Sequence, residues 1–103
     1  MVYFIYILEC SNAAFYTGYT TDIDRRYQEQ LEGSAKSKFT RSFPPKRIAA
    51  AWKFDTSLSC VLKLEHAIKA LTKSKKKALV DNPKSIYQLL NNGEEDVQLL
   101  DIS

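Results

Sequence analysis

The feature that most constrains the fold is a continuous apolar run at the start of the sequence. Residues 2–8 read VYFIYIL, in which β-branched and aromatic side chains follow one another without a polar break. Successive side chains of a strand point to opposite faces of its sheet, so a strand that is apolar at consecutive positions is buried on both faces. The run therefore predicts a central strand, which needs a neighbouring strand on each side.

The segments that follow supply candidate neighbours. Residues 11–14 (SNAA) read as a turn, and residues 15–19 (FYTGY) predict a second strand that forms a hairpin with the first. Gly18 lies inside this strand, which indicates a bulge or a close backbone approach. Residues 48–54 (IAAAWKF) predict a third strand.

Three stretches predict helices, and the first two have side chains that can cap their first turns. They are residues 22–31, capped by Thr21 or Asp22 and ended by Gly33; residues 57–71, started by Thr56 or Ser57; and the lysine-rich residues 72–80. A last helical piece is expected over residues 84–90. We expect residues 91–103 to form a loosely held acidic tail. Without repeats or a linker, the sequence reads as one domain over residues 1–90, with this tail attached.

Positive charge is concentrated in the middle of the sequence. The whole chain carries +3 at neutral pH, but residues 36–77 hold 12 basic and 2 acidic residues, and the segments on either side are net acidic. A basic block of this size favours a polyanionic partner, because lysine and arginine near phosphates release condensed counterions. The alternative, a solubilising surface, would intersperse the two signs. We therefore expect nucleic acid as the partner.

Other features exclude several kinds of protein. Cys10 and Cys60 lack the spacing of a metal site and read as small buried thiols. The single histidine, His66, falls on the polar side of its predicted helix, which excludes a histidine-based triad and a multi-histidine metal site. No apolar run approaches the length of a membrane span, and the first residues lack the basic segment of a signal peptide. The cytoplasm is therefore the expected location.

A few polar residues in apolar surroundings point to a site. Tyr6 and Tyr16 lie on the predicted hairpin, although a buried strand tyrosine is more often a core residue with a bonded hydroxyl. Arg26 and Gln30 flank the apolar stripe of the first helix, and a guanidinium there needs an anionic partner. Glu65 lies on the apolar face of the second helix, where a carboxylate is costly unless it meets a cation, hydrogen-bond donors or a metal. An ion pair with Arg26 and a metal site explain Glu65 equally well.

The order of these residues resembles the GIY-YIG nuclease superfamily, whose domain also occurs in an excinuclease subunit and in homing endonucleases. Residues 4–6 (FIY) stand where that family has its GIY strand, and residues 16–18 (YTG) stand where it has YIG. The stretch YTGYTTDIDRRYQEQ is similar to the family's YIG-x-T-x-N-L-x-x-R-x-x-x-H segment. Glu65 stands where the family has a metal-binding glutamate. The resemblance covers residues 2–80 and is to the small single-domain bacterial members.

The resemblance implies an α+β fold in which a three-stranded antiparallel sheet is flanked by helices. It also implies metal-dependent hydrolysis of DNA phosphodiester bonds, in DNA repair or recombination. Tyr6 or Tyr16 would help to generate the nucleophile, Arg26 would stabilise charge on the phosphate, and Glu65 would hold one Mg²⁺ or Mn²⁺ ion. Gln30 stands where many members have a histidine. Glutamine can position a water or a phosphate oxygen, but it cannot shuttle a proton at neutral pH.

Basic residues outside this set are the predicted contacts to the DNA backbone: Lys36, Lys38, Arg41, Lys46, Arg47, Lys73 and Lys76. Such contacts position a duplex without specifying its sequence, so we expect weak, salt-sensitive binding with little sequence preference. Gln30 supports a second hypothesis, a DNA-binding module that keeps the fold without activity. Glu65 favours the enzyme, because a binding module needs no metal ligand. A third hypothesis is a protein-interaction domain that recruits another nuclease or repair factor.

Overall fold

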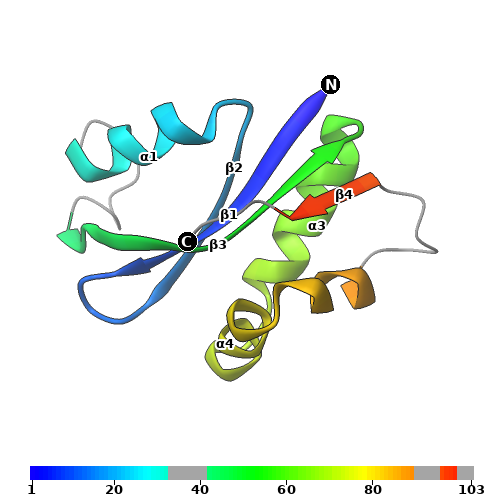
Figure 1. Ribbon diagram of the computed structural model, residues 1–103. Helices are drawn as coiled ribbons and strands as arrows, with labels where there is room; N and C mark the ends of the chain where they lie inside the picture. Colours follow the sequence, from blue (N-terminus) through cyan, green and yellow to red (C-terminus); the bar gives the residue numbers. More distant parts are fainter. Residues whose placement is uncertain (33–41, 90–95, 100–103) are drawn as a thin grey trace.

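The computed structural model describes residues 1–32, 42–89 and 96–99, and it has the predicted α+β architecture. Figure 1 shows the strands as one twisted sheet with helices packed around it. The elements in chain order are β1 (Val2–Cys10), β2 (Phe15–Thr20), α1 (Ile23–Glu32), β3 (Pro45–Asp55), α3 (Leu58–Lys69), α4 (Lys73–Asp81), the 3₁₀ helix η1 (Pro83–Leu89) and β4 (Asp96–Leu99).

All strands of the sheet pair in an antiparallel sense, in the order β2-β1-β3-β4. β1 has a neighbour on each side, and residues 5–8 are all buried, as the apolar run predicts. The three predicted strands and their antiparallel pairing are therefore confirmed. Residues 96–99 of the acidic tail form β4 along the free edge of β3, a strand that the sequence analysis did not predict.

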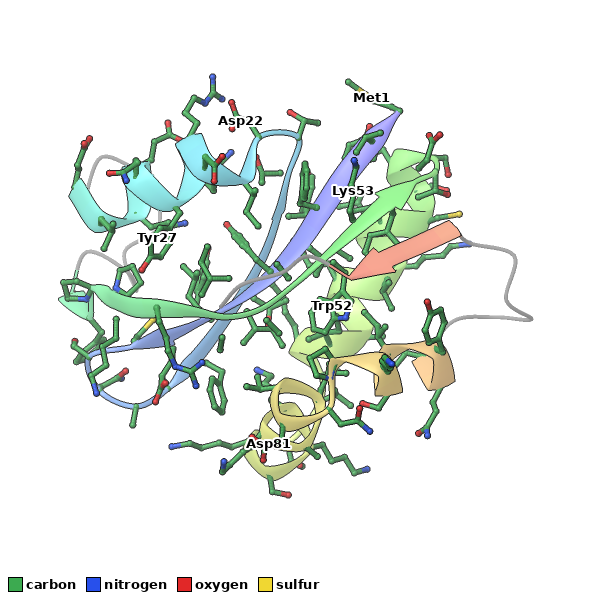
Figure 2. The ribbon with its side chains drawn as sticks, in the orientation of Figure 1. Met1, Asp22, Tyr27, Trp52, Lys53 and Asp81 are labelled. Carbon is green, nitrogen blue, oxygen red and sulfur yellow. The ribbon has the colours of Figure 1, made fainter. Side chains whose placement is uncertain are left out.

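The main core lies on one face of the sheet. Ile5 and Ile7 of β1 point to this face, together with Trp52 of β3, and they pack against apolar side chains of α3, α4 and η1. Trp52 is fully buried, and Figure 2 shows it at the centre of the molecule. Its indole Nε1 donates a hydrogen bond to the carbonyl oxygen of Pro83 at 3.0 Å, which ties β3 to the start of η1.

The opposite face of the sheet carries Tyr6, one of the two candidate tyrosines. Tyr6 lies between Ile5 and Ile7 in β1, so its side chain points away from the main core. It forms a hydrogen bond with Gln30 of α1. Hence α1 covers the face on which Tyr6 lies, and α3 covers the other face (Figure 1).

The helices begin at capping side chains, and the caps of α1 and α3 were predicted. Asp22 Oδ1 accepts a hydrogen bond from the Arg25 N–H at 3.1 Å, at the start of α1. Ser57 and Thr72 cap α3 and α4 in the same way. These bonds satisfy N–H groups that the first turn of a helix otherwise leaves without a partner. Because Asp22 fixes where α1 starts, it also fixes which side chains of α1 face the sheet.

The remaining expectations concern single residues and membrane association. Cys10 is buried as predicted, whereas Cys60 is only partly buried, and both thiols are free. His66 is exposed on α3, as its predicted position on the polar side requires. Within the three described ranges, no helix has the length and apolarity that a membrane span requires.

Candidate active site

A pocket of about 440 Å³ lies at the edge of the sheet formed by β2. Tyr6, Tyr16, Arg26 and Glu65 all line it, and they come from β1, β2, α1 and α3 respectively. The pocket extends across β2, because its lining includes residues from both faces of that strand. Four of the five candidate catalytic residues from the sequence are therefore brought together, and the fifth lies next to them.

The position of Tyr6 depends on Gly18, its partner across the β1–β2 ladder. A Cβ atom on Gly18 would lie 2.6 Å from Cζ of Tyr6, and it would be closer still to the hydroxyl oxygen. The phenol ring thus lies against the backbone of β2, in space that any other residue would fill with its side chain. The close approach expected at Gly18 is this contact with Tyr6.

Gln30 contacts Tyr6 and does not itself line the pocket. It is only 2% exposed, and its side chain forms a hydrogen bond with the Tyr6 phenol. Burial raises the pKa of Tyr6 to about 12, against the lowering effects of the Gln30 hydrogen bond and the Arg26 charge. Gln30 therefore affects the pocket only indirectly. Its hydrogen bond orients the Tyr6 phenol and favours the ionised form of that phenol.

The Arg26 guanidinium is only weakly held within α1. Its Nε lies 3.6 Å from Oε1 of Glu29, which is an ion-pair distance but too long for a hydrogen bond. In the described part of the chain, this buried nitrogen has no hydrogen-bond partner. The side chain is 37% exposed and lines the pocket, so it can approach an anion there.

Glu65 pairs with Lys69, one turn further along α3. The Lys69 Nζ lies 3.1 Å from Oε1 of Glu65. The sequence leaves two explanations open for Glu65, an ion pair with Arg26 and a metal site. Among the described residues, Glu65 forms its ion pair with Lys69 and not with Arg26. Lys69 also lines the pocket, and the sequence analysis missed it, although its spacing of four residues from Glu65 on one helix was a usable signal. Arg25 is exposed and lines the same pocket.

The carboxylate of Glu65 suits a metal ion that protein and substrate hold together. Within the described ranges, no group of three or more His, Cys, Asp and Glu side chains could hold a metal ion. Mg²⁺ keeps several waters and commonly binds through one or two carboxylates together with substrate phosphates. Glu65, with 12% of its side chain exposed and facing an open pocket, offers that kind of ligand. The donor set therefore fits one Mg²⁺ or Mn²⁺ ion bound jointly with a phosphate.

The predicted contacts to the DNA backbone that fall in the described residues do not line the pocket. Lys46 and Arg47 are exposed at the start of β3, where the Arg47 Nε donates a hydrogen bond to Oε1 of Glu9 at 2.7 Å. Lys73 and Lys76 belong to α4, which begins shortly after Lys69 along the chain. The other three predicted contacts fall in residues 33–41, outside the described residues: Lys36, Lys38 and Arg41.

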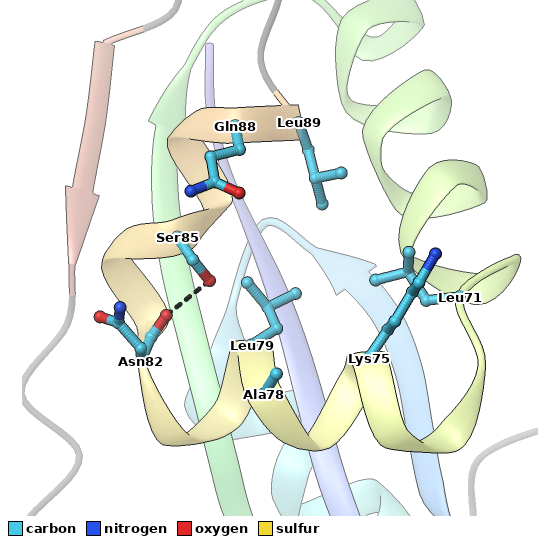
Figure 3. Close-up of a pocket in the computed structure, with 8 residues that line it drawn as sticks. All are labelled: Leu71, Lys75, Ala78, Leu79, Asn82, Ser85, Gln88 and Leu89. Atoms are coloured by element: carbon cyan, nitrogen blue, oxygen red, sulfur yellow. Dashed lines mark hydrogen bonds between the residues drawn. The ribbon is translucent and has the colours of Figure 1, made fainter.

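A larger pocket of about 540 Å³ lies between α4 and η1, and Figure 3 shows it. Leu79 and Leu89 contribute apolar surface, and Lys75 lies on its rim. The Ser85 hydroxyl in its wall donates a hydrogen bond to the backbone oxygen of Asn82 at 2.7 Å. This mostly apolar lining contains none of the predicted site residues, so we regard the smaller pocket as the candidate site.

Comparisons with known proteins identify the family of the chain. Residues 2–78 match the family model of the GIY-YIG catalytic domain, and this range contains all five candidate catalytic residues. A UPF0213 protein from Halalkalibacterium halodurans is 40% identical over 80 residues, which are 78% of this chain and 83% of the relative. A UPF0213 protein from Haloquadratum walsbyi is 41% identical over 86 residues, which are 84% of this chain and 94% of the relative.

The fold is also found among solved structures. The solution NMR structure of the UPF0213 protein from Bacillus halodurans is similar to this one with a TM-score of 0.51 and 36% sequence identity. The similarity covers 88% of this chain and 98% of that protein. Since the matched range spans β1, β2, β3, α1, α3 and the residues of the pocket, sequence and structure lead to one conclusion. The chain belongs to the GIY-YIG family.

Proposed function

We propose that this protein is an endonuclease that hydrolyses DNA phosphodiester bonds with the help of one divalent metal ion. The observation that carries the proposal is the convergence of two phenols, a guanidinium and a carboxylate on one pocket: Tyr6, Tyr16, Arg26 and Glu65. Each residue alone has a structural explanation, but those explanations do not require the four to meet. Such an activity would serve DNA repair or recombination.

Arg26 is suited to the negative charge of a phosphate. A planar guanidinium can donate two parallel hydrogen bonds to phosphate oxygens, and the Arg26 Nε has no hydrogen-bond partner among the described residues. When water adds to the phosphorus, negative charge builds up on the phosphate oxygens. A cation fixed at that point stabilises the transition state more than the ground state, and this difference accelerates the reaction.

Tyr6 or Tyr16 is the group that would take a proton from the attacking water. With a pKa of about 12, Tyr6 holds its proton at neutral pH and needs more positive charge nearby to act as a base. A divalent cation held by Glu65 would supply that charge and would also neutralise the phosphate. Gln30 and Arg26 already lower the pKa of Tyr6. Gln30 can position the phenol through its hydrogen bond, although a glutamine cannot shuttle a proton itself.

The test is cleavage of supercoiled, nicked, single-stranded and branched DNA with Mg²⁺ or Mn²⁺. Glu65→Gln should abolish cleavage, and so should EDTA. Asp81→Asn is the matched control, because Asp81 also pairs with a lysine four residues away, Lys77, but lies on α4 outside the pocket. Undiminished cleavage by Glu65→Gln would end the proposal of a metal ligand at this position.

The observation that favours a second function is Gln30 in place of a histidine. If the wild-type protein binds DNA and cuts none of these substrates, it is better described as a DNA-binding module, and Gln30→His is the variant that should restore cleavage. In both cases the basic side chains outside the pocket would contact the backbone, so binding should weaken steeply with salt. A flat salt dependence would remove them from the docking surface.

A further inference from the structure

A cation already contacts the carboxylate that is proposed to hold the metal. The Lys69 Nζ lies 3.1 Å from Oε1 of Glu65, and both residues line the candidate pocket. The two side chains differ in their freedom to move. Lys69 is the last residue of α3 and its side chain is 49% exposed, whereas the side chain of Glu65 is 12% exposed. The lysine can therefore swing into solvent while the carboxylate keeps its place.

This ion pair has a consequence for any second cation. A carboxylate as buried as Glu65 is costly without a positive partner, and Lys69 supplies one. A divalent ion at the same carboxylate would lie a few ångströms from the Lys69 ammonium, and the two like charges would repel each other. The ammonium and the metal ion are thus competitors for Glu65.

We propose that Lys69 occupies the cation position at Glu65 in the protein alone, and that it leaves this position when a metal ion and a phosphodiester enter the pocket together. The inference rests on the proposed function, since it takes Glu65 as the metal ligand. The phosphodiester offers the displaced ammonium a new anionic partner. Metal and DNA then favour each other's binding, and the metal alone binds weakly.

The experiment measures Mn²⁺ binding to the purified full chain without DNA, by isothermal titration calorimetry. Lys69→Met removes the competing charge, and Lys77→Met is its matched control. Lys77 pairs with Asp81 at the same spacing and at 3.3 Å, but both of these side chains are more than half exposed on α4. We expect Lys69→Met to bind Mn²⁺ about three- to tenfold more tightly than the wild type, a modest gain because the Lys69 charge is screened by solvent. Lys77→Met should bind as the wild type does.

The possible results separate this inference from the proposed function. Equal or weaker Mn²⁺ binding by Lys69→Met, with binding still dependent on Glu65, would overturn the role of Lys69 and leave the metal site standing. Equal binding by wild type and Glu65→Gln would overturn the metal site itself. A lysine with a merely structural role would not raise the affinity when removed. Lys69→Gln, a second neutral variant that keeps a polar end, should show the same gain if Lys69→Met folds poorly.

Discussion

Replacing Gly18 by alanine tests whether the Tyr6 ring needs a residue without a side chain at this position of β2. A Cβ atom at this position would lie 2.6 Å from Cζ of Tyr6 and 2.9 Å from its Cε2. Carbon atoms in contact prefer separations of about 3.5–4.0 Å, so the ring must move by roughly 1 Å or the two strands must separate. Both residues are buried, and overpacking of this kind costs about 1–3 kcal/mol.

Urea unfolding should report this cost as a lower midpoint with an unchanged m-value. The matched control is the same substitution in a Tyr6→Ala background, where no ring is left to clash. There Gly18→Ala should be neutral or stabilising, because alanine in a strand is favoured over glycine by about 0.5–1 kcal/mol. Equal costs in the two backgrounds would refute the reasoning, since additive effects mean that the two residues do not interact.

Three further predictions concern single residues. Because burial raises the pKa of Tyr6 from 10.0 to about 12, the unfolded chain loses this proton first as the pH rises, and stability should fall between these values. Over this pH window the free energy of unfolding of the wild type, obtained from unfolding curves, should fall by up to about 2–3 kcal/mol more than that of Tyr6→Phe. Equal losses in the two proteins would count against a buried phenol. Arg26→Ala should lower turnover on the order of 10²–10³-fold in a cleavage assay while DNA binding persists. Loss of binding as well would assign Arg26 to the docking surface. Ala13 has a φ of 66°, so Ala13→Gly should stabilise the hairpin by about 0.5–1 kcal/mol, and a lower midpoint in calorimetry would contradict this.

The parts of the fold that were predictable have local causes. The VYFIYIL run is continuously apolar and rich in β-branched and aromatic residues, which favours a strand buried on both faces, and it is the central β1. Asp22 can cap a helix only immediately after itself, which set the start of α1. β4 had no such signature. Residues 96–99 become a strand because they pair with β3, a partner distant in the sequence, and strand formation depends strongly on such context.

The candidate site also has a part that could be predicted from the sequence and a part that could not. Its members could be named from the sequence for two reasons. An arginine and a glutamate stand beside apolar helix stripes, and the tyrosines have the spacing that the family has. Their partners could not all be named. Glu65 pairs with Lys69 because a helix makes residues four apart into neighbours, whereas a contact between Arg26 and Glu65 depends on how α1 and α3 pack on opposite faces of the sheet. Gln30 likewise became a partner of Tyr6 only through that packing.

The pocket draws on β1, β2, α1 and α3, and this order along the chain bears on how the protein is made. Synthesis proceeds from the N-terminus at about 5–20 residues per second, so both tyrosines and Arg26 leave the ribosome before Glu65 does. A nascent chain therefore holds the phenols and the guanidinium before it has the carboxylate that completes the set. On the proposed mechanism, the chain cannot cut DNA until α3 has been made and has brought Glu65 to the pocket.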